Sequence, residues 1–207
     1  MEKSFDIVED DPFREELLQQ YLDDRIIIIN DQIDDEMLFS VVLRIMQWNK
    51  EDRDIPVDKR KPIWLFMQTI GGSSIYGFNV VDAIISSQTP VYAVCFALCA
   101  SMGFHIFISA KKRFAFKHSI LLIHDGELSV NNSTSKAKDT MKFFDQLEER
   151  TKEHVIQHTS ISSEKYDEIY EKEYYMYSDA EGRELGCVDY IINEDVQLDE
   201  ILKNERK

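Results

Sequence analysis

A serine in an unusually apolar stretch is the residue of this sequence best suited to covalent chemistry. Ser101 lies inside Ala97–Gly103, a stretch of small residues within a run from 90 to 110 that holds no Lys, Arg, Asp or Glu. A hydroxyl at the junction between a buried strand and a helix lies near free backbone N–H groups, which stabilise a developing anion. Small neighbours also allow a carbonyl group to approach the backbone. The same pattern fits a packing serine, but we interpret Ser101 as a nucleophile.

A glycine pair provides the second chemical feature. Gly71 and Gly72 follow the apolar run Ile63–Met67. Two glycines let the backbone pass close to a ligand and turn N–H groups toward it, as an oxyanion hole requires, although they also fit an ordinary tight turn. The sequence has neither G-x-G-x-x-G nor a Gly-Lys-Ser/Thr motif, which are the common signatures of nucleotide binding. We therefore expect no cofactor.

One histidine is well placed to act as a general base. His124 ends the apolar run Ile120–Ile123 and enters a loop that contains Gly126. A ring in this position is held by its strand and can still reach a cleft, where a general base belongs.

The other four histidines are poorer candidates. His105 lies in an apolar segment, and His118 follows a lysine. His154 and His158 are four residues apart on an expected helix, but Val155 stands where a zinc peptidase would have its glutamate. We interpret that pair as a solvated helix face and expect no metal site.

Alternating apolar and amphipathic segments position these residues. The run Arg25–Ile29 has the pattern of a central strand buried on both faces, and the charged segment 49–61 is expected to be a surface loop. The expected strands are 25–29, 63–67, 90–95, 113–116, 119–124 and 188–192, and the expected helices are 37–48, 75–86, 97–108, 135–158, 162–170 and 178–186. Such alternation predicts an α/β fold with a mostly parallel sheet.

Composition limits the domain organisation and the partners. The 207 residues are 43% hydrophobic, enough for one core domain with terminal extensions. We assign residues 1–24 to an acidic N-terminal arm, 25–194 to the domain and 195–207 to a polar tail, of which 199–207 is expected to fray. A formal charge of −15 argues against nucleic acid or an anionic membrane surface as the main partner.

Two further features concern the compartment. The run 91–109 is long enough to span a membrane, but Pro90 and the β-branched residues after it predict a strand followed by a separate helix, so no membrane is expected. The three cysteines form no C-x-x-C pair, and the acidic N-terminus lacks the apolar region of a signal peptide. Both observations favour a reducing, cytoplasmic location.

Four motifs in this order resemble the ClpP family of serine peptidases. They are Gly71-Gly72-Ser73, Ala100-Ser101-Met102-Gly103, Ile123-His124 and the Glu-x-x-Glu-Leu-Gly-x-Val-Asp sequence of 181–189. The resemblance extends from about Arg25 to Glu194. It implies the ClpP/crotonase-like fold, with repeated β-β-α units, a mostly parallel sheet and a protruding "handle" helix at 135–158.

The resemblance also implies roles for single residues. Ser101 would be the nucleophile, His124 its base, and the N–H groups of Gly72 and Met102 the oxyanion hole. The sequence departs from the family at Thr69-Ile70, where Ser-Pro is usual before the glycines, and at Asp125-Gly126, where Gln-Pro usually follows the histidine.

The third member of the triad needs a shifted alignment. The family has an aspartate a few residues before the last motif, and counting back without a gap reaches Tyr174. One extra residue instead makes Glu173 the acid, and a glutamate can orient a histidine. Asp167, or no acid at all with low activity, are the alternatives.

The expected function is that of a serine endopeptidase working through an acyl-enzyme on peptides or unfolded proteins. By the resemblance, it would be the proteolytic subunit of a ring-shaped protease, with either a single heptameric ring or two rings stacked into a tetradecamer through the 135–158 helix. A separate AAA+ Clp-type ATPase unfoldase would feed it. The alternatives are a catalytically impaired structural subunit of the same ring and a crotonase-type acyl-CoA enzyme, which also uses two N–H groups beside a glycine turn.

Overall fold

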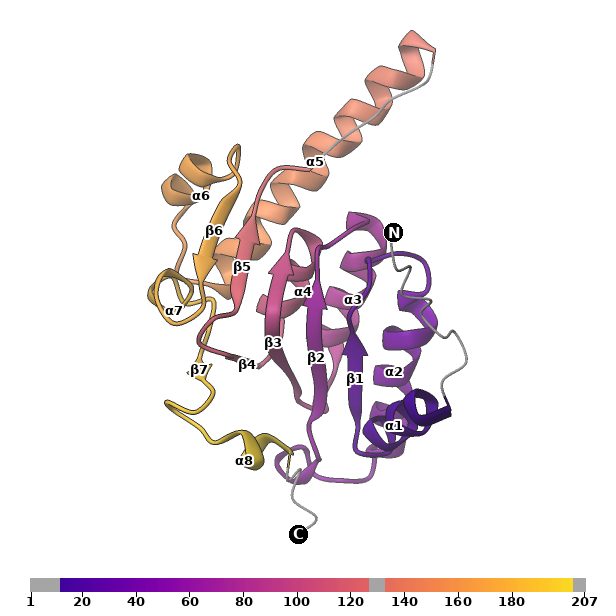
Figure 1. Cartoon of the computed structure of the whole chain (residues 1–207). Helices are drawn as coiled ribbons and strands as arrows, with labels where there is room; N and C mark the ends of the chain where they lie inside the picture. The colour runs from indigo at the N-terminus through magenta and orange to yellow at the C-terminus, as the bar shows by residue number, and fades with distance from the viewer. Residues whose placement is uncertain (1–11, 127–132, 203–207) are drawn as a thin grey trace, which may run out of the picture.

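A twisted, mainly parallel sheet organises the molecule (Figure 1). The computed structural model of the chain describes residues 12–126 and 133–202. The strands are β1 (Ile26–Ile29), β2 (Ile63–Thr69), β3 (Val91–Ala100), β4 (Lys112–Ala115), β5 (Ile120–Ile123), β6 (Tyr174–Tyr177) and β7 (Tyr190–Ile191). The parallel order is β1-β2-β3-β4-β7, while β5 pairs with the end of β3 and β6 runs antiparallel to β5. The α/β fold with a mostly parallel sheet is thus confirmed.

Helices cover the sheet and one of them projects from the body. They are α1 (Pro12–Asp23), the π-helix η1 (Leu38–Val42), α2 (Leu43–Glu51), the 3₁₀-helix η2 (Val57–Lys59), α3 (Ser74–Ser86), α4 (Met102–Ile108), α5 (Thr134–His158), α6 (Ser163–Ile169), α7 (Glu181–Glu184) and α8 (Leu198–Leu202). The N-terminal half of α5 extends away from the rest of the fold as the expected handle helix (Figure 1). No helix in the described ranges is long and apolar enough to cross a membrane.

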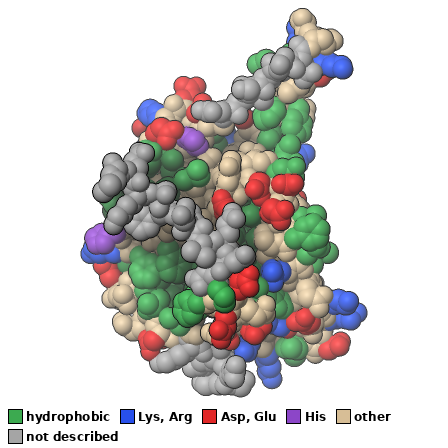
Figure 2. All heavy atoms as spheres, turned by 45° about the vertical axis from the view of Figure 1, so that its right-hand side comes forward, with side chains coloured by type: hydrophobic (Ala, Val, Ile, Leu, Met, Phe, Trp, Pro, Cys, Tyr) green, Lys and Arg blue, Asp and Glu red, His purple; other side chains and the backbone are tan. Residues whose placement is uncertain are grey.

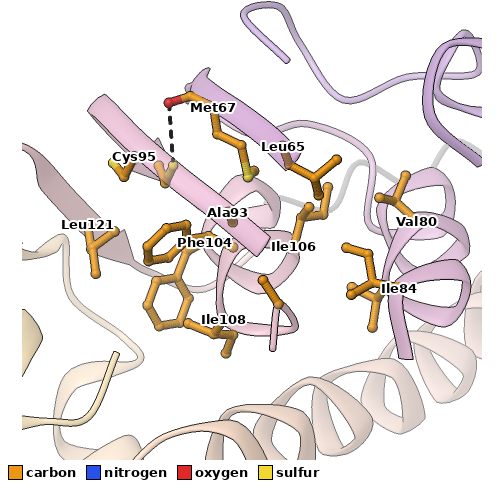
Figure 3. Close-up of a cluster of buried hydrophobic side chains, with 14 of the residues drawn as sticks. Leu65, Met67, Val80, Ile84, Ala93, Cys95, Phe104, Ile106, Ile108 and Leu121 are labelled. Carbon is orange, nitrogen blue, oxygen red and sulfur yellow. Dashed lines mark hydrogen bonds between the residues drawn. The ribbon is translucent and has the colours of Figure 1, made fainter. Parts of the chain in front are cut away.

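Side chains on the two faces of the sheet enter different cores. In β2, Leu65 and Met67 are fully buried against α3 and α4, whereas Trp64 and Phe66 point to the opposite face and pack in a second cluster. Figure 3 shows the first core, in which Leu65 and Met67 share a cluster with Val80 of α3 and Ile106 of α4. A strand covered on both faces must be apolar throughout, which explains the runs that made these strands recognisable.

The largest correction concerns the segment before Ser101. The sequence predicts a strand over 90–95 and a helix from Ala97, but β3 continues to Ala100 and α4 begins only at Met102. Leu98, Cys99 and Ala100 continue the sheet by pairing with β5. This pairing with a distant strand overrides the local preference of small and unbranched residues for a helix.

Other differences lie toward the C-terminus and in one loop. Residues 174–177 form β6, which the sequence analysis missed, and the helix expected over 178–186 is the single turn α7. The tail expected to fray contains α8, whose Ile201 is 3% exposed. The segment 49–61 is not wholly a surface loop, because α2 continues to Glu51 and Asp52 is buried. Parts of the arm, of the loop after His124 and of the tail lie outside the described residues.

Candidate active site

Ser101 occupies a strained turn between β3 and α4. Its φ of 52° and ψ of −124° lie in a region that residues other than glycine rarely adopt, and such strain is often concentrated at functional sites. The turn is held from both sides, because Ser101 N donates to the Leu122 carbonyl of β5 (3.0 Å) and Ser101 O accepts from Phe104 N (3.0 Å). The hydroxyl is therefore presented at the end of the central strand by a rigid backbone.

The glycine pair lies directly against this turn. A Cβ atom added to Gly71 would lie 2.6 Å from the Ser101 Cβ and 2.7 Å from the Ala100 carbonyl oxygen. With φ of 97° and 149°, Gly71 and Gly72 also adopt backbone conformations that side chains disfavour. Gly71 N donates to Thr69 Oγ1 (3.1 Å), and Thr69 Oγ1 donates to the Asp31 carbonyl (2.7 Å). The glycine turn is therefore anchored to the segment that follows β1.

Among residues 12–126 and 133–202, two backbone donors near the Ser101 turn make no hydrogen bond to the protein. Met102 is the first residue of α4, where a helix leaves its N–H groups without an internal acceptor. Ile33 N donates to Gly71 O, and Ser73 N donates to Ile33 O, so neither hydrogen bond uses the N–H of Gly72. Neither the Gly72 nor the Met102 N–H donates to an acceptor within residues 12–126 and 133–202. Met102 also lines the cavity described below, whereas Gly72 does not.

His124 and Glu173 are joined by a hydrogen bond. His124 Nδ1 donates to Glu173 Oε1 across 2.9 Å. The last residue pair of β5 and β6 is Ile123 with Tyr174, so these two residues occupy the next position along the antiparallel ladder. The strand pairing therefore places the carboxylate on the imidazole, and Tyr175 Oη adds a contact of 3.4 Å to Glu173 Oε2.

The competing acid is used elsewhere. Both carboxylate oxygens of Asp167 bond to Lys152 Nζ, at 2.6 and 2.8 Å. The structure thus brings Glu173, and not Asp167, to the ring of His124. Because β6 was missed in the sequence, only the likeness of motifs pointed to this pairing. The aromatic run Tyr174–Tyr177, whose residue types favour strands, was the local signal that could have supported it.

Ser101 and His124 line one small cavity. Its volume is about 180 Å³, and its walls include Met102 of α4 together with Phe144 and Leu147 of α5. No hydrogen bond joins the Ser101 hydroxyl to the His124 ring among the described residues, which is common for catalytic pairs without substrate. A larger cavity of about 710 Å³ between α2 and α3 has none of the candidate catalytic residues in its lining.

His105, a poorer candidate for the base because it lies in an apolar segment, also reaches the cavity. It lies one helical turn after Ser101 and forms part of the cavity wall, although only 6% of its surface is exposed. His154, expected on a solvated face, is buried as well, and its Nε2 donates to the His105 carbonyl (3.1 Å). Burial, assisted by the charges of His154 and His124, lowers the pKa of His105 to about 3. The spacing of four from Ser101 was the available signal.

Comparison with known proteins shows what the chain as a whole is similar to. The family model described as Clp protease matches residues 11–195. ATP-dependent Clp protease proteolytic subunit 1 of Bacillus cereus is 28% identical over 179 residues, which cover 86% of this chain and 89% of that protein. A mutant ClpP1 from Listeria monocytogenes has the same fold, with a TM-score of 0.73 at 22% identity, covering 88% of this chain and 98% of that one.

Proposed function

The chain belongs to the Clp protease family, and on that premise we propose that it is a serine endopeptidase that cleaves peptide bonds through an acyl-enzyme. The observation that carries the proposal is the hydrogen bond from His124 Nδ1 to Glu173 Oε1, on a ring that shares a cavity with Ser101. Three groups of suitable type, at the ends of the neighbouring strands β3, β5 and β6, match the nucleophile, base and orienting acid of a serine peptidase.

The reaction assigns each side chain a role. Ser101 Oγ attacks the peptide carbonyl while Nε2 of His124 takes its proton, and the protonated ring then gives that proton to the departing amine. Glu173 holds Nδ1–H, which leaves Nε2 as the basic nitrogen and stabilises the imidazolium. A water molecule, activated by the same ring, hydrolyses the acyl-enzyme and regenerates Ser101.

The free N–H groups of Gly72 and Met102 receive the oxyanion of the tetrahedral intermediate. They lie at a turn that is fixed by Thr69 and by the contact of Gly71 with Ser101, so the donors need no rearrangement during the reaction. One such donor contributes about 3–4 kcal/mol to transition-state stabilisation in peptidases where it has been removed.

The proposed enzyme assembles into rings that stack through α5. This helix projects from the body (Figure 1), and hydrophobic side chains are exposed along the projecting part (Figure 2). Met141 and Phe143 on it are 55% and 48% exposed. Apolar side chains on a projecting helix favour contact with a second copy of the chain. Light scattering after size exclusion at micromolar concentration should give a multiple of the 24.3 kDa chain, and a stable monomer would contradict the ring.

A separate unfoldase is part of the same proposal. The Bacillus relative is named as the proteolytic subunit of an ATP-dependent protease. By analogy, this chain would receive unfolded substrates from a Clp-type AAA+ ATPase and would alone cleave only short peptides. Its three cysteines are free and buried, which fits a reducing location such as the cytoplasm.

Hydrolysis of a fluorogenic peptide by the purified protein tests the proposal. Wild-type protein should release the fluorophore, and Ser101→Ala should reduce kcat by at least a thousandfold. The missing hydrogen bond between Ser101 and His124 also fits a second candidate, a catalytically impaired ring subunit. That candidate requires an assembled protein in which wild type and Ser101→Ala are equally inactive. Turnover of an acyl-CoA thioester that survives Ser101→Ala would instead indicate a crotonase-type enzyme.

A further inference from the structure

The two proposed oxyanion donors belong to different segments, whose spacing must be fixed. Gly72 lies in the turn after β2, and Met102 begins α4, which follows β3. The segments touch, because a Cβ atom added to Gly71 would lie 3.0 Å from Met102 N. An oxyanion is stabilised only when both N–H groups are held toward the same oxygen. Thr69, the last residue of β2 and the partner of Cys99 in the sheet, contacts both segments.

The hydroxyl of Thr69 holds the glycine turn. It donates to the Asp31 carbonyl (2.7 Å) and accepts from Gly71 N (3.1 Å). From the same segment after β1, Ile33 N donates to Gly71 O (2.9 Å). A threonine hydroxyl that accepts from the N–H two residues later closes a turn, and here it does so where glycine would otherwise give the backbone much freedom. The position of the turn therefore depends on a buried hydroxyl.

The methyl group of Thr69 contacts the start of α4. A Cβ atom added to Gly103, the second residue of this helix, would overlap Thr69 Cγ2. The next nearest atoms would be the carbonyl oxygen and Cβ of Thr69, at 3.6 and 3.7 Å, which are ordinary contacts. Gly103 is not among the glycines with positive φ, so its backbone would accept an alanine. The methyl group of Thr69 is what excludes one.

We propose that Thr69 is a positioning residue for the oxyanion hole. Its hydroxyl holds the turn that carries Gly72, and its methyl group sets how closely the start of α4, with Met102, approaches that turn. The χ1 angle of a β-branched side chain is stiff, so the two branches act as one rigid spacer. This role rests on the proposed peptidase function, and it adds a residue that does not itself touch the substrate.

Thr69→Val tests the hydroxyl, because it keeps the branched shape and removes both hydrogen bonds. We expect kcat to fall by about 100-fold, as for a catalytic group displaced by a fraction of its size, while KM changes little. A peptide aldehyde provides a second readout. Ser101 Oγ adds to its carbonyl carbon, and the oxygen of the resulting hemiacetal occupies the oxyanion hole. Its Ki should rise by the same factor as kcat falls, because both report binding of the tetrahedral state.

Thr89→Val is the matched control for lost stability. Thr89 is also buried, and its Oγ1 donates to Asp52 Oδ2 (2.8 Å), but it does not line the cavity of Ser101. Its substitution should lower Tm as that of Thr69 does, since each leaves a buried polar group unpaired. Unlike Thr69→Val, it should leave kcat and the aldehyde Ki at their wild-type values. A purely structural role for Thr69 would make the two variants behave alike.

Moving one methyl group across the contact tests the spacing. Gly103→Ala alone should lower kcat by about tenfold or more, because its Cβ displaces α4 from the turn. Thr69→Ser keeps the hydroxyl and removes the methyl group. The double variant Thr69→Ser/Gly103→Ala conserves the total volume, so it should recover most of the kcat that Gly103→Ala loses. A double variant no better than Gly103→Ala would overturn the spacer, and this comparison remains if Thr69→Val does not fold.

Amide hydrogen exchange tests the position of the turn without turnover. The N–H of Gly71 should exchange faster in Thr69→Val, which lacks its acceptor, and at the wild-type rate in Thr69→Ser. Unchanged exchange in Thr69→Val would overturn the inference. So would a Thr69→Val protein that keeps wild-type kcat and aldehyde affinity, although the peptidase would then stand. A wild-type protein that neither cleaves peptides nor binds the aldehyde would instead overturn the peptidase itself, whatever the exchange of Gly71.

Discussion

Nδ1 of His124 lies 2.9 Å from Oε1 of Glu173, and both residues stand one position beyond the last pair of strands β5 and β6. The antiparallel ladder therefore fixes the pair through the backbone. Since 60% of the Glu173 side chain is exposed, we assign it little weight in stability and a positioning role toward the ring.

Glu173→Gln should lower kcat by about 10²–10⁴-fold, because the amide no longer favours the tautomer with a basic Nε2. Glu173→Asp should recover part of the activity if its shorter carboxylate still reaches Nδ1. The measurement is kcat and kcat/KM on a fluorogenic peptide. Asp167→Asn is the matched control, since Asp167 pairs with Lys152, and it should leave both constants within about twofold. An equal loss in the two variants would contradict the role of Glu173.

Gly71→Ala should damage both the fold and the site. The new Cβ would lie 2.6 Å from the Ser101 Cβ, at a φ of 97° that a side chain disfavours. We expect the free energy of unfolding to fall by about 2–5 kcal/mol, from strain and overpacking together. Gly126→Ala, with no atom within 4 Å of its added Cβ, should change it by less than about 0.5 kcal/mol. Equal denaturation midpoints for the two variants would contradict the close approach.

Many of the strands and turns could be predicted from local sequence patterns, whereas the backbone positions that hold the site residues could not. The strand Ile26–Ile29 and the turn at Gly71-Gly72 are visible in the sequence because burial on both faces and positive φ each demand particular residues. The end of β3 at Ala100 depends on pairing with β5, which no local window contains. The position of His105 in the cavity wall could not be predicted, because an apolar helical segment does not show which tertiary cavity it borders.

Acid should destabilise the protein through two buried histidines. Burial lowers the pKa of His105 to about 3 and that of His154 to about 4, from an ordinary value of 6.5. Below pH 6.5 these two histidines are therefore protonated in the unfolded chain but stay neutral in the folded protein. The stabilisation is complete above pH 6.5 and is lost toward pH 4, by up to about 1.4 kcal/mol per pH unit for each histidine.

His154→Phe should reduce the slope contributed by this pair by about half between pH 6 and 4.5. Urea unfolding at a series of pH values measures it, with the exposed His118→Phe as control, which should keep the wild-type slope. A slope that is the same in all three proteins would contradict burial of a neutral His154.

A buried ion pair anchors the start of β1. Arg25 donates from Nη1 and Nη2 to the two carboxylate oxygens of Asp52 (2.6 and 2.8 Å), and Thr89 Oγ1 donates to Oδ2 (2.8 Å). Burial raises the pKa of Asp52, but these hydrogen bonds outweigh it and hold the pKa below its ordinary value. Asp52→Asn should therefore lower the free energy of unfolding by about 3 kcal/mol.

Chemical denaturation measures this effect, and Glu51→Gln is its control. Glu51 lies 3.9 Å from Arg25 with 48% of its side chain exposed, so its loss should cost less than about 1 kcal/mol. The prediction is that Asp52→Asn lowers the free energy of unfolding more than Glu51→Gln does, whatever the size of each loss. A smaller effect for Asp52→Asn than for Glu51→Gln would refute it.

Covalent labelling by a fluorophosphonate tests the central claim most directly. Mass spectrometry of the treated protein should show one adduct, located on Ser101, because only a serine beside a basic histidine and free N–H donors reacts at a useful rate. Labelling should disappear in Ser101→Ala and fall strongly in His124→Ala. An adduct of equal yield in Ser101→Ala, or no adduct on an assembled wild-type protein, would contradict the peptidase.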